Sequence, residues 1–444
     1  MTKLVSKKSA PLNGITKIPG DKSISHRALM LGAIAKGETI ISGLLEGEDV
    51  LATGEAMRQL GAKVHDGDDG LWRVEGVGLG NLTEPRNVLD MGNSGTSTRL
   101  LMGLMGGHPI AATLTGDNSL IKRPMGRVVR PLEQMGISFL GRAENRLPLT
   151  LKGPQSLKPI TYHLPIASAQ VKSAILLAGL TAKGTTIVIE DTPTRDHTEN
   201  MLRAFGVTVD VETGEDGETI ISLKGGQTLQ PCAIDVPGDP SSAAFPAVAA
   251  ILREGSDVTL KNICINETRI GLYTTLIEMG ANIEFINKRT QGGEPVADLH
   301  IKGTGPLTGI DVDPARVPSM IDEFPALAMA AACATGTTRM TDLGELRVKE
   351  SDRLLMVAQG LKACGVALEM GEDSLTVNSN GHPPIGGGAF IKTELDHRIA
   401  MAFLVLGTVT DEPVTIDDAT PIKTSFPDFV ELMNDLGCDI ETKT

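Results

Sequence analysis

One short pattern recurs six times along the chain and constrains the fold more than any other feature. It consists of an amphipathic helix, a glycine and an alternating strand, and it reads MRQLGAKV, LEQMGISF, LRAFGVTV, LIEMGANI, LKACGVAL and LMNDLGCDI. The glycines follow one another at intervals of 70 to 85 residues, at Gly61, Gly136, Gly206, Gly280, Gly365 and Gly437. A glycine directly after a helix adopts a positive φ without a Cβ clash, so it ends the helix. Six such glycines at near-constant spacing predict six structural repeats.

A second kind of helix, rich in small apolar residues, lies between the glycines, as in ALMLGAIAKGETIIS, AILLAGLTAKGTTIVIE, AVAAILREGSDVTLKN and ALAMAAACATGTTRMTD. It is apolar nearly all round, so we expect it to be buried, with the amphipathic helix outside it. Each repeat is therefore predicted to read strand, buried helix, strand, outer helix, strand, strand. The strands expected to lead into the next buried helices are VLDMG, ITYHLP, AIDVPGD, GIDVDP and AFIKTEL.

Six repeats divide naturally into two domains of three in a mixed α/β (α+β) chain. The predicted N-terminal domain spans 21–235 (repeats 1 to 3), and the predicted C-terminal domain spans 1–20 plus 236–444 (repeats 4 to 6). The sixth repeat lacks its last strand, which the segment 4–11 can supply from the other end of the chain. The glycine-rich segment GHPPIGGG, at 381–388, is predicted to be a surface loop.

Composition excludes several kinds of partner. A net charge of −14 and an aromatic content of 3% argue against nucleic acid and anionic membranes, but not against a small anion in a local cationic pocket. The longest apolar run, Phe324 to Ala334, contains Pro325 and is too short to span a bilayer. The five cysteines form no CxxC, so reduced thiols are favoured over disulfides or a zinc site. Residues 1–10 contain no apolar signal segment, and we expect a cytoplasmic protein.

The turns that enter the buried helices are unusually polar, and they read GDKSISHR (20–27), GNSGTSTR (92–99), ASAQVK (167–172), GDPSSAAF (238–245), PSMIDEF (318–324) and ELDHR (394–398). Helix N-termini bind phosphate and carboxylate groups. The alternative is plain N-capping, which we favour for Asp239 and Ser241. For the turns with Lys22, Arg27 and Arg398 we favour anion binding, because charged residues ahead of a buried helix are costly without a partner.

Two charged loops, IKRPMGR at 121–127 and LRVKESDR at 346–353, are expected over the same face as these turns. If the three turns of each domain share one face, the two faces would form an anion-binding cleft. His197 and Glu199 in TRDHTE are interpreted as helix-start polarity rather than a metal site, because no further ligands accompany them. The sequence contains no Walker A, HExxH or dinucleotide-binding motif.

The segments GDKSISHR, GNSGT, KRPMGR, SAQVKSA, LRVKESDR, DHRIAM and SFPDF, in this order and over essentially the whole chain, resemble the 5-enolpyruvylshikimate-3-phosphate (EPSP) synthase family. The resemblance implies the two-domain enolpyruvyltransferase fold, with three βαβαββ units in each domain. It implies transfer of the carboxyvinyl (enolpyruvyl) group of phosphoenolpyruvate to the 5-hydroxyl of shikimate 3-phosphate, with release of phosphate. This is a shikimate-pathway step towards chorismate and the aromatic amino acids. The resemblance also implies a monomer that needs no metal or organic cofactor and whose partners are these two small anions.

The motif matches imply two sets of substrate-binding residues. Because both substrates carry phosphate and carboxylate groups, several cations must face them. The residues implied for shikimate 3-phosphate are Lys22, Ser23, Arg27, Ser168, Ala169, Gln170, Arg195, Asp322 and Lys349. The residues implied for phosphoenolpyruvate are Lys22, Gly95, Arg123, Gln170, Arg353 and Arg398.

The implied reaction is an addition and an elimination, which need a base for the 5-hydroxyl and an acid for the methylene carbon. The resemblance implies Asp322 as the proton acceptor, and we assign Glu350 as the acid, with Lys22 sharing in proton transfer. The alternative for Asp322 is a helix-capping carboxylate. Two positions depart from the commoner family pattern. Glu345 stands in place of an asparagine and is not carried over as a ligand, and Lys423 lies one residue farther from FPD, so its role stays open.

Four further motifs resemble the class II members of the family, which are often tolerant of glyphosate: GDKS (20–23), SAQVK (168–172), RDHTE (195–199) and NETR (266–269). Glyphosate is the family's inhibitor at the phosphoenolpyruvate site, so it is a candidate inhibitor of this chain. Gly95 keeps the space that the inhibitor needs, whereas Leu100 stands where sensitive members usually have proline. We therefore expect partial tolerance.

Two alternative functions belong to other classes. UDP-N-acetylglucosamine enolpyruvyltransferase shares the fold and the donor, but it lacks the KSISHR and DHR segments and typically carries a cysteine in a mobile loop. None of the five cysteines in this chain lies in a polar turn. A repeat scaffold that binds partners on one face would not need acids and bases gathered at helix starts. Phosphate release from phosphoenolpyruvate, with and without shikimate 3-phosphate, separates the three functions.

Overall fold

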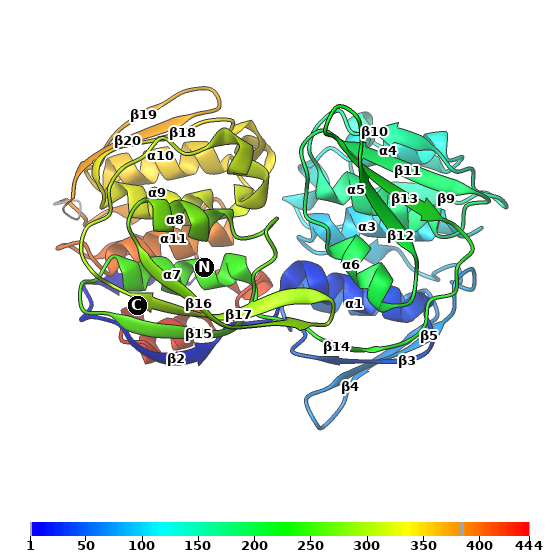
Figure 1. Cartoon of the computed structure of the whole chain (residues 1–444), viewed down its shortest axis with the longest axis horizontal. Coiled ribbons are helices and arrows are strands. Elements are labelled where there is room, and N and C mark those ends of the chain that lie inside the picture. The colour runs from blue at the N-terminus through cyan, green and yellow to red at the C-terminus, as the bar shows by residue number, and fades with distance from the viewer. Residues whose placement is uncertain (1, 382–385, 444) are drawn as a thin grey trace. The chain divides into compact units, whose positions relative to one another are not determined.

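The computed structural model describes residues 2–381 and 386–443 and divides into two compact units (Figure 1). The N-terminal unit comprises Gly20–Val236 and Gln291–Glu294, and the C-terminal unit comprises Met1–Pro19, Pro237–Thr290 and Pro295–Thr444. The domain boundaries proposed from the sequence, 21–235 and 1–20 plus 236–444, stay a prediction. Of the loop predicted at 381–388, residues 382–385 lie outside the described residues.

The N-terminal unit contains three four-stranded sheets, with strand orders β14-β3-β5-β4, β6-β7-β9-β8 and β10-β11-β13-β12. In each sheet the first pair is parallel and the other two pairs are antiparallel. In the sheets that begin with β6 and β10, a helical crossover joins the parallel pair. The strands are β3 (Lys36–Ser42), β4 (Lys63–Asp66), β5 (Trp72–Val77), β6 (Leu89–Asp90), β7 (Ala111–Thr115), β8 (Ser138–Gly141), β9 (Leu149–Lys152), β10 (Thr161–His163), β11 (Thr185–Glu190), β12 (Val209–Thr213), β13 (Thr219–Lys224) and β14 (Ala233–Asp235). The helices are α1 (Lys22–Ile34), α2 (Glu48–Gln59), α3 (Gly95–Gly106), α4 (Gly126–Gln134), α5 (Ala169–Gly179) and α6 (His197–Ala204), with the 3₁₀ turns η1 (Leu120–Lys122) and η2 (Ala143–Asn145).

The C-terminal unit also contains three sheets, with strand orders β16-β17-β15-β2, β18-β20-β19 and β21-β22-β1-β23. Its strands are β1 (Leu4–Lys7), β2 (Asn13–Lys17), β15 (Asp257–Cys264), β16 (Asn282–Gln291), β17 (Glu294–Lys302), β18 (Thr335–Met340), β19 (Ala367–Met370), β20 (Leu375–Asn380), β21 (Phe390–Ile391), β22 (Val414–Ile416) and β23 (Asp439–Thr442). Its helices are α7 (Pro240–Ile251), α8 (Gly271–Glu278), α9 (Phe324–Ala332), α10 (Arg353–Ala363), α11 (His397–Gly407) and α12 (Phe429–Asp435). Its 3₁₀ helices are η3 (Pro314–Ser319), η4 (Ile321–Glu323), η5 (Gly344–Val348) and η6 (Thr420–Thr424).

Strands far apart in the sequence complete two of the C-terminal unit's sheets. β1 lies between β22 and β23 and is antiparallel to both, so the strand missing from the sixth repeat comes from the start of the chain, as predicted. The segment AIDVPGD was expected to serve the repeat that follows it, but its strand β14 pairs with β3 of the first repeat. β2 takes the corresponding place beside β15. The reason is where the chain crosses between the units. It leaves the C-terminal unit just after β2 and the N-terminal unit just after β14, so each strand pairs within the unit that precedes the crossing.

A second predicted strand is also wrong. Among the described residues, GIDVDP forms a single isolated parallel bridge to β18, through Asp311, and Thr308, just before the segment, forms a second. The extended segment is short because Asp313 caps η3, which starts at the next residue.

The six repeat glycines have φ angles from 80° to 108°, and each follows an outer helix, as predicted. The inner helices α7 and α9 are buried along their whole length, as their apolar sequences predict. α3 and α5 approach so closely that a Cβ on Gly103 would lie 2.1 Å from the carbonyl oxygen of Ala174. Each unit has its own hydrophobic core, so each can hold its polar helix starts in fixed positions.

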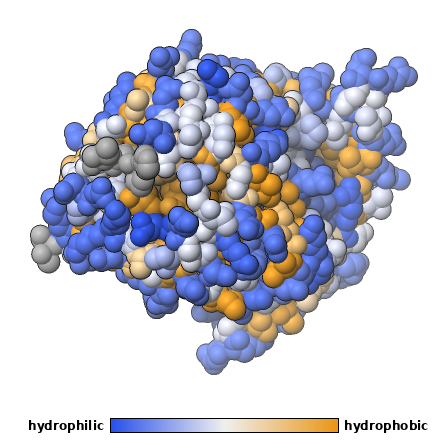
Figure 2. Space-filling model, turned by 60° about the vertical axis from the view of Figure 1, so that its left-hand side comes forward, coloured by the Kyte–Doolittle hydropathy of each residue, from blue (hydrophilic) through white to orange (hydrophobic). Residues whose placement is uncertain are grey.

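The surface drawn in Figure 2 is mostly hydrophilic, with hydrophobic residues between the polar ones. The large exposed hydrophobic residues of the described chain are spread over many elements, and the most exposed are Leu140 (77%) and Ile15 (72%). None of the described helices combines the length and the apolar character needed to cross a membrane. The five cysteines are free thiols, and all but Cys232 are buried.

Candidate active site

The polar turn GDKSISHR begins α1. Asp21 caps the helix, because its Oδ1 accepts a hydrogen bond from the backbone N–H of Ile24 at 2.9 Å. Lys22 is the first residue of the helix, and its ammonium group pairs with the buried carboxylate of Asp49 in α2. Sequence reasoning missed Asp49, although a carboxylate in the first turn of the next helix was a signal for it. The capping hydrogen bond and the ion pair therefore fix the helix N-terminus that carries Lys22 and Ser23.

Arg27 lies one turn after Ser23 and is only 4% exposed. Its Nη1 donates to the carbonyl oxygen of Ser23 at 2.9 Å. Burial lowers the pKa of Arg27 to about 10; nearby carboxylates, Glu199 first among them, oppose this shift, while the charge of Arg195 adds to it. The guanidinium stays charged at neutral pH, and the structure brings Arg195 close enough to affect it.

The N-termini of α3 and α5 are joined by the side chain of Gln170. Its Nε2 donates to Thr96 Oγ1 at 3.0 Å, and its Oε1 accepts from Arg99 Nη1 at 2.9 Å. Ser168 caps α5 by accepting a hydrogen bond from the first turn of that helix, and Ala169 is the helix's first residue. The segment 168–170, predicted from the SAQ motif, therefore lies at a helix N-terminus, where an anion is favoured.

Arg123 lies beside the start of α3. Its guanidinium donates to Asn93 Oδ1 at 2.8 Å and to Ser119 Oγ at 3.1 Å, and the residue is 8% exposed. A Cβ built on Gly95 would lie 3.1 Å from Arg123 Nη1 and 2.9 Å from Arg99 Nη1. Three residues predicted for phosphoenolpyruvate, Gly95, Arg123 and Gln170, thus gather at the start of α3. Sequence reasoning missed Asn93 and Arg99 as their partners.

His26 lies between two of these cationic residues and is fully buried. Burial, followed by the charges of Lys22 and Arg27, lowers the pKa of His26 well below its ordinary value of 6.5. The unfolded chain therefore binds one more proton than the folded chain once the pH falls below about 6.5. We expect the free energy of unfolding to decrease as the pH falls from 6.5 to 5, by at most about 1.4 kcal/mol per pH unit from this group.

The change His26→Asn should remove this pH dependence, which thermal unfolding measured at several pH values can detect. The matched control is His65→Asn, because His65 is exposed in the same unit. An unchanged slope in His26→Asn, or the same loss of slope in both variants, would contradict the assignment.

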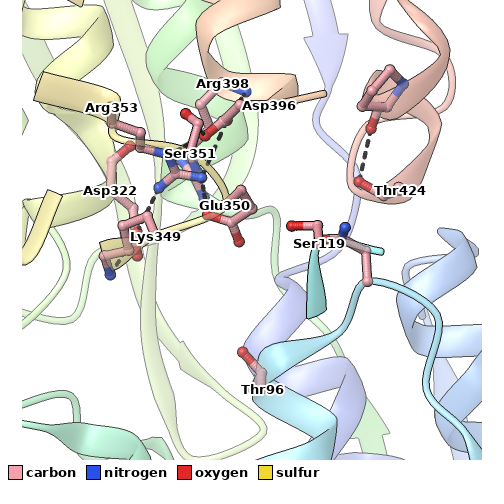
Figure 3. A network of polar contacts seen from close by, with 12 residues as sticks. Thr96, Ser119, Asp322, Lys349, Glu350, Ser351, Arg353, Asp396, Arg398 and Thr424 are labelled. Carbon is pink, nitrogen blue, oxygen red and sulfur yellow. Dashed lines mark hydrogen bonds and ion pairs between the residues drawn. The ribbon is translucent and has the colours of Figure 1, made fainter. Parts of the chain in front are cut away.

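Arg353, the first residue of α10, is the centre of the polar cluster in the C-terminal unit (Figure 3). Its Nε donates to Asp396 Oδ2 at 2.8 Å, its Nη1 lies 3.1 Å from Asp322 Oδ1, and its Nη2 donates to the carboxylate of Glu350. The Arg353 side chain is 1% exposed. Burial lowers its pKa, but the three carboxylates, Asp396 first, outweigh that effect and raise the pKa of Arg353 above its ordinary value.

Two further predicted residues join this cluster. Lys349 Nζ lies 3.1 Å from Asp322 Oδ1, and Arg398 Nη1 donates to the Asp322 backbone oxygen at 3.1 Å. Glu323, and not Asp322, is the N-cap residue of α9, which gives no support to the capping alternative for Asp322. The structure thus brings together Asp322, Lys349, Glu350, Arg353 and Arg398 (Figure 3).

Asp396 is a member of this cluster that sequence reasoning missed. It is completely buried, caps α11 by accepting from the backbone N–H of Arg398 at 2.9 Å, and accepts from Ser351 Oγ at 3.0 Å. The sequence could have suggested Asp396 as such a partner. A buried arginine needs a carboxylate nearby, and Asp396 precedes a helix start in the DHR segment.

The N-capping predicted for Asp239 is confirmed, whereas Ser241 is a residue of α7 whose hydroxyl group contacts Glu323 and Arg269. Asp239 Oδ1 accepts from the backbone N–H of Ser241 at 2.8 Å. The same oxygen lies 2.9 Å from Arg269 Nη2, so the carboxylate also has a cationic partner.

His197 and Glu199 of the TRDHTE segment point to different partners. Glu199 Oε1 lies 2.8 Å from Lys172 Nζ, whereas His197 Nδ1 lies 2.8 Å from Glu294 Oε1. One ligand atom each of Asp196, His197 and Glu294 lies within 4.8 Å of the others, an arrangement that a metal ion could use. Glu294 could not be associated with His197 from the sequence, because 97 residues separate them.

Cationic helix starts and an arginine surrounded by carboxylates can bind anions and move protons. Comparison with known proteins identifies the fold and the family. The fold is that of the enolpyruvyl transferases. The chain aligns over 100% of its length with 99% of the enolpyruvyl transferase NikO from Streptomyces tendae, with a TM-score of 0.78 at 19% identity.

Sequence similarity narrows the class to one family. The family model described as EPSP synthase (3-phosphoshikimate 1-carboxyvinyltransferase) matches residues 6–433. A 3-phosphoshikimate 1-carboxyvinyltransferase from Parvibaculum lavamentivorans is 58% identical over 98% of this chain and 96% of its own length. An EPSP synthase structure from Acinetobacter baumannii has a TM-score of 0.88 at 46% identity, with full coverage of both chains. The chain therefore belongs to the EPSP synthase family, and the predicted family, fold and enzyme class, a transferase, are confirmed.

Proposed function

We propose that the chain transfers the carboxyvinyl group of phosphoenolpyruvate to the 5-hydroxyl of shikimate 3-phosphate through the residues of these two polar clusters. The observation that carries the proposal is the cluster around Arg353, where two carboxylates suited to proton transfer, Asp322 and Glu350, contact the same buried guanidinium. Curated relatives 55% to 58% identical over nearly the whole chain are named 3-phosphoshikimate 1-carboxyvinyltransferase, which supports the same reaction.

Substrate binding follows from charge and position. We assign the polar groups at the starts of α1 and α5 to shikimate 3-phosphate, together with Arg195, Asp322 and Lys349. Gly95, Arg123, Gln170, Arg353 and Arg398 are assigned to phosphoenolpyruvate, and Lys22 is shared by the two substrates. Arginines suit these ligands because a planar guanidinium binds carboxylate or phosphate through two parallel hydrogen bonds.

In the proposed reaction, Asp322 accepts the proton of the 5-hydroxyl while the hydroxyl oxygen bonds to C2 of phosphoenolpyruvate. Glu350 donates a proton to the methylene carbon, which becomes a methyl group in the tetrahedral intermediate. The methyl group then returns a proton to the Glu350 carboxylate, and the carbon–carbon double bond re-forms as the bond from C2 to the phosphate oxygen breaks. Phosphate leaves with the electron pair of that bond and takes up the proton that Asp322 had accepted. Binding of phosphoenolpyruvate to Arg353 would compete with the Glu350 contact, which would release the Glu350 carboxyl for proton transfer.

The direct test is phosphate release from phosphoenolpyruvate by the purified full chain. Release is expected only when shikimate 3-phosphate is present, and a metal chelator should leave the rate unchanged. Release without an acceptor, or release that requires UDP-N-acetylglucosamine, would contradict the proposal. A rate that falls with the chelator would instead assign a role to Asp196, His197 and Glu294.

We also propose that the chain belongs to class II and is partly tolerant of glyphosate. Leu100 is completely buried in α3, the helix that begins with Gly95, so it can affect where that helix start lies. The change Gly95→Ala should raise tolerance further. The added methyl group must displace the guanidiniums of Arg123 and Arg99, which would lie 3.1 and 2.9 Å from it, so affinity for phosphoenolpyruvate should also fall, by roughly tenfold if one charged hydrogen bond is lost.

Competitive inhibition by glyphosate against phosphoenolpyruvate measures both effects. Inhibition as tight as in a glyphosate-sensitive enzyme assayed alongside would contradict the class assignment. An unchanged inhibition constant in Gly95→Ala would contradict the steric argument.

A cytoplasmic location is proposed from the composition and the free thiols, and a monomer is proposed from the family resemblance. The molar mass in solution, expected near 46.8 kDa, tests the oligomeric state.

A further inference from the structure

Arg27 is a buried cation whose direct partners are all uncharged oxygens. Its Nε donates to Thr198 Oγ1 at 2.7 Å, its Nη2 donates to Ser173 Oγ at 2.8 Å, and its Nη1 donates to a backbone carbonyl. Arg353 differs, because three carboxylates surround it. A guanidinium has five N–H donors, so the described residues leave two of those of Arg27 for a ligand. The three hydrogen bonds fix the group in place without neutralising its charge.

The two hydroxyl groups that hold Arg27 also bind each other. Thr198 Oγ1 donates to Ser173 Oγ at 2.7 Å, and both residues are at most 1% exposed. Thr198 belongs to α6 and Ser173 to α5, so this hydroxyl pair links two helices to the arginine of α1 (Figure 1). A hydroxyl oxygen buried in this way has a fixed position, and it therefore fixes the direction of the donors that point at it.

The residues adjacent to the hydroxyl pair lock α5 against α6. Lys172 precedes Ser173, and Glu199 follows Thr198. The Lys172 ammonium lies 2.8 Å from Glu199 Oε1 and 2.9 Å from Glu190 Oε2, and these three side chains are 1% to 2% exposed. The ion pairs hold the two helix starts together, so the distance between the two hydroxyl groups is set by the fold and not by Arg27 alone.

We infer that Thr198 and Ser173 are positioning residues for substrate binding, which fix the Arg27 guanidinium as an un-neutralised cation for an anionic group of shikimate 3-phosphate. The inference rests on the proposed function, because Arg27 is assigned there to that substrate. Neither residue contacts the reacting atoms in this proposal; each acts through Arg27. A carboxylate in either place would hold the arginine equally well but would cancel the charge that the substrate needs.

The test is the binding of shikimate 3-phosphate to the full chain, measured by calorimetry, with steady-state kinetics alongside. Thr198→Val and Ser173→Ala should each weaken binding about tenfold, because each removes one hydrogen bond to a charged group. The KM for shikimate 3-phosphate should rise in proportion, while kcat and the KM for phosphoenolpyruvate change little. Thr198→Ser keeps the hydroxyl group and should bind like the unmodified chain.

Two further measurements distinguish a positioning role for these hydroxyl groups from a loss of packing: a control substitution elsewhere in the unit, and the same substitution made in a variant that lacks Arg27. Thr186 is a buried threonine of β11 whose hydroxyl has no partner among the described residues, so Thr186→Val should leave binding unchanged. In an Arg27→Ala background, Thr198→Val should cause no further loss, because its effect passes through the arginine.

The outcomes distinguish this inference from the proposed function. If Arg27→Ala itself leaves binding intact, the assignment of Arg27 to the substrate fails. If Arg27→Ala weakens binding but Thr198→Val and Ser173→Ala do not, the positioning role is overturned. The same holds if Thr198→Val weakens binding equally with and without Arg27.

Discussion

The change Asp322→Asn is expected to lower turnover by about 10²-fold or more, because it removes the proposed base while keeping the shape of the side chain. Arg353 retains Asp396 and Glu350 as partners, so the cluster should stay folded. The affinity for shikimate 3-phosphate should fall much less than turnover. Steady-state phosphate release gives the turnover, and calorimetric titration of the same protein gives the affinity.

Two further variants complete this experiment. Glu350→Gln removes the proposed acid and should lower turnover by a similar factor. Asp311→Asn is the matched control, because Asp311 is a carboxylate of the same unit that is 73% exposed and pairs with a surface arginine. Near-normal turnover in Asp322→Asn or in Glu350→Gln would refute the role of that residue. A loss of turnover in Asp311→Asn would show that the effect is not specific to the cluster.

The repeats were predictable from the sequence because their signals are local. A glycine that ends a helix acts through its own backbone angle, and Gly61 and its five equivalents all have the positive φ that the pattern requires. The partner of a strand is not a local property. Nothing within AIDVPGD shows that β14 pairs with β3, about 190 residues earlier, because that choice depends on where the chain crosses between the units.

Motif residues of the candidate site were predictable, whereas their partners were not. Arg353 and Arg123 lie in charged segments that have a recognisable pattern. Asp396 and Asn93 contact those arginines from other elements, so only the folded chain shows the contact. The existence of such partners was still predictable, because a buried guanidinium requires hydrogen-bond acceptors nearby. Asp396, which precedes a helix start in the DHR segment, is the carboxylate that Arg353 Nε contacts.

Three of the motifs that suggested class II each contribute one residue to an ion pair within the chain. The lysine of SAQVK and the glutamate of RDHTE bind each other, as Lys172 and Glu199. The arginine of NETR, Arg269, pairs with Asp239 at the start of α7. These motifs therefore describe how helix starts are packed. Any influence of Lys172, Glu199 and Arg269 on glyphosate would be indirect, through the positions of the side chains that the helices carry.

The packing argument makes the change Lys172→Met the largest expected loss of stability. Burial alone lowers the pKa of Lys172, but Glu199 and Glu190 outweigh it, so the net pKa is raised and the ammonium is charged at neutral pH. Methionine fills a similar volume but leaves two buried carboxylates without their cation. Removing one partner of a buried ion pair typically costs about 3–5 kcal/mol.

For a unit of this size, such a loss should lower the melting temperature by roughly 6–20 °C, which calorimetry of the full chain can measure. Lys183→Met is the matched control, because Lys183 is exposed in the same unit and its replacement should change the melting temperature little. Adding Glu190→Gln and Glu199→Gln to Lys172→Met should recover much of the loss, since no uncompensated charge then stays buried. If Lys172→Met alone melts like Lys183→Met, the ion pairs do not hold α5 and α6 together, and the fixed position of Thr198 and Ser173 would need another cause.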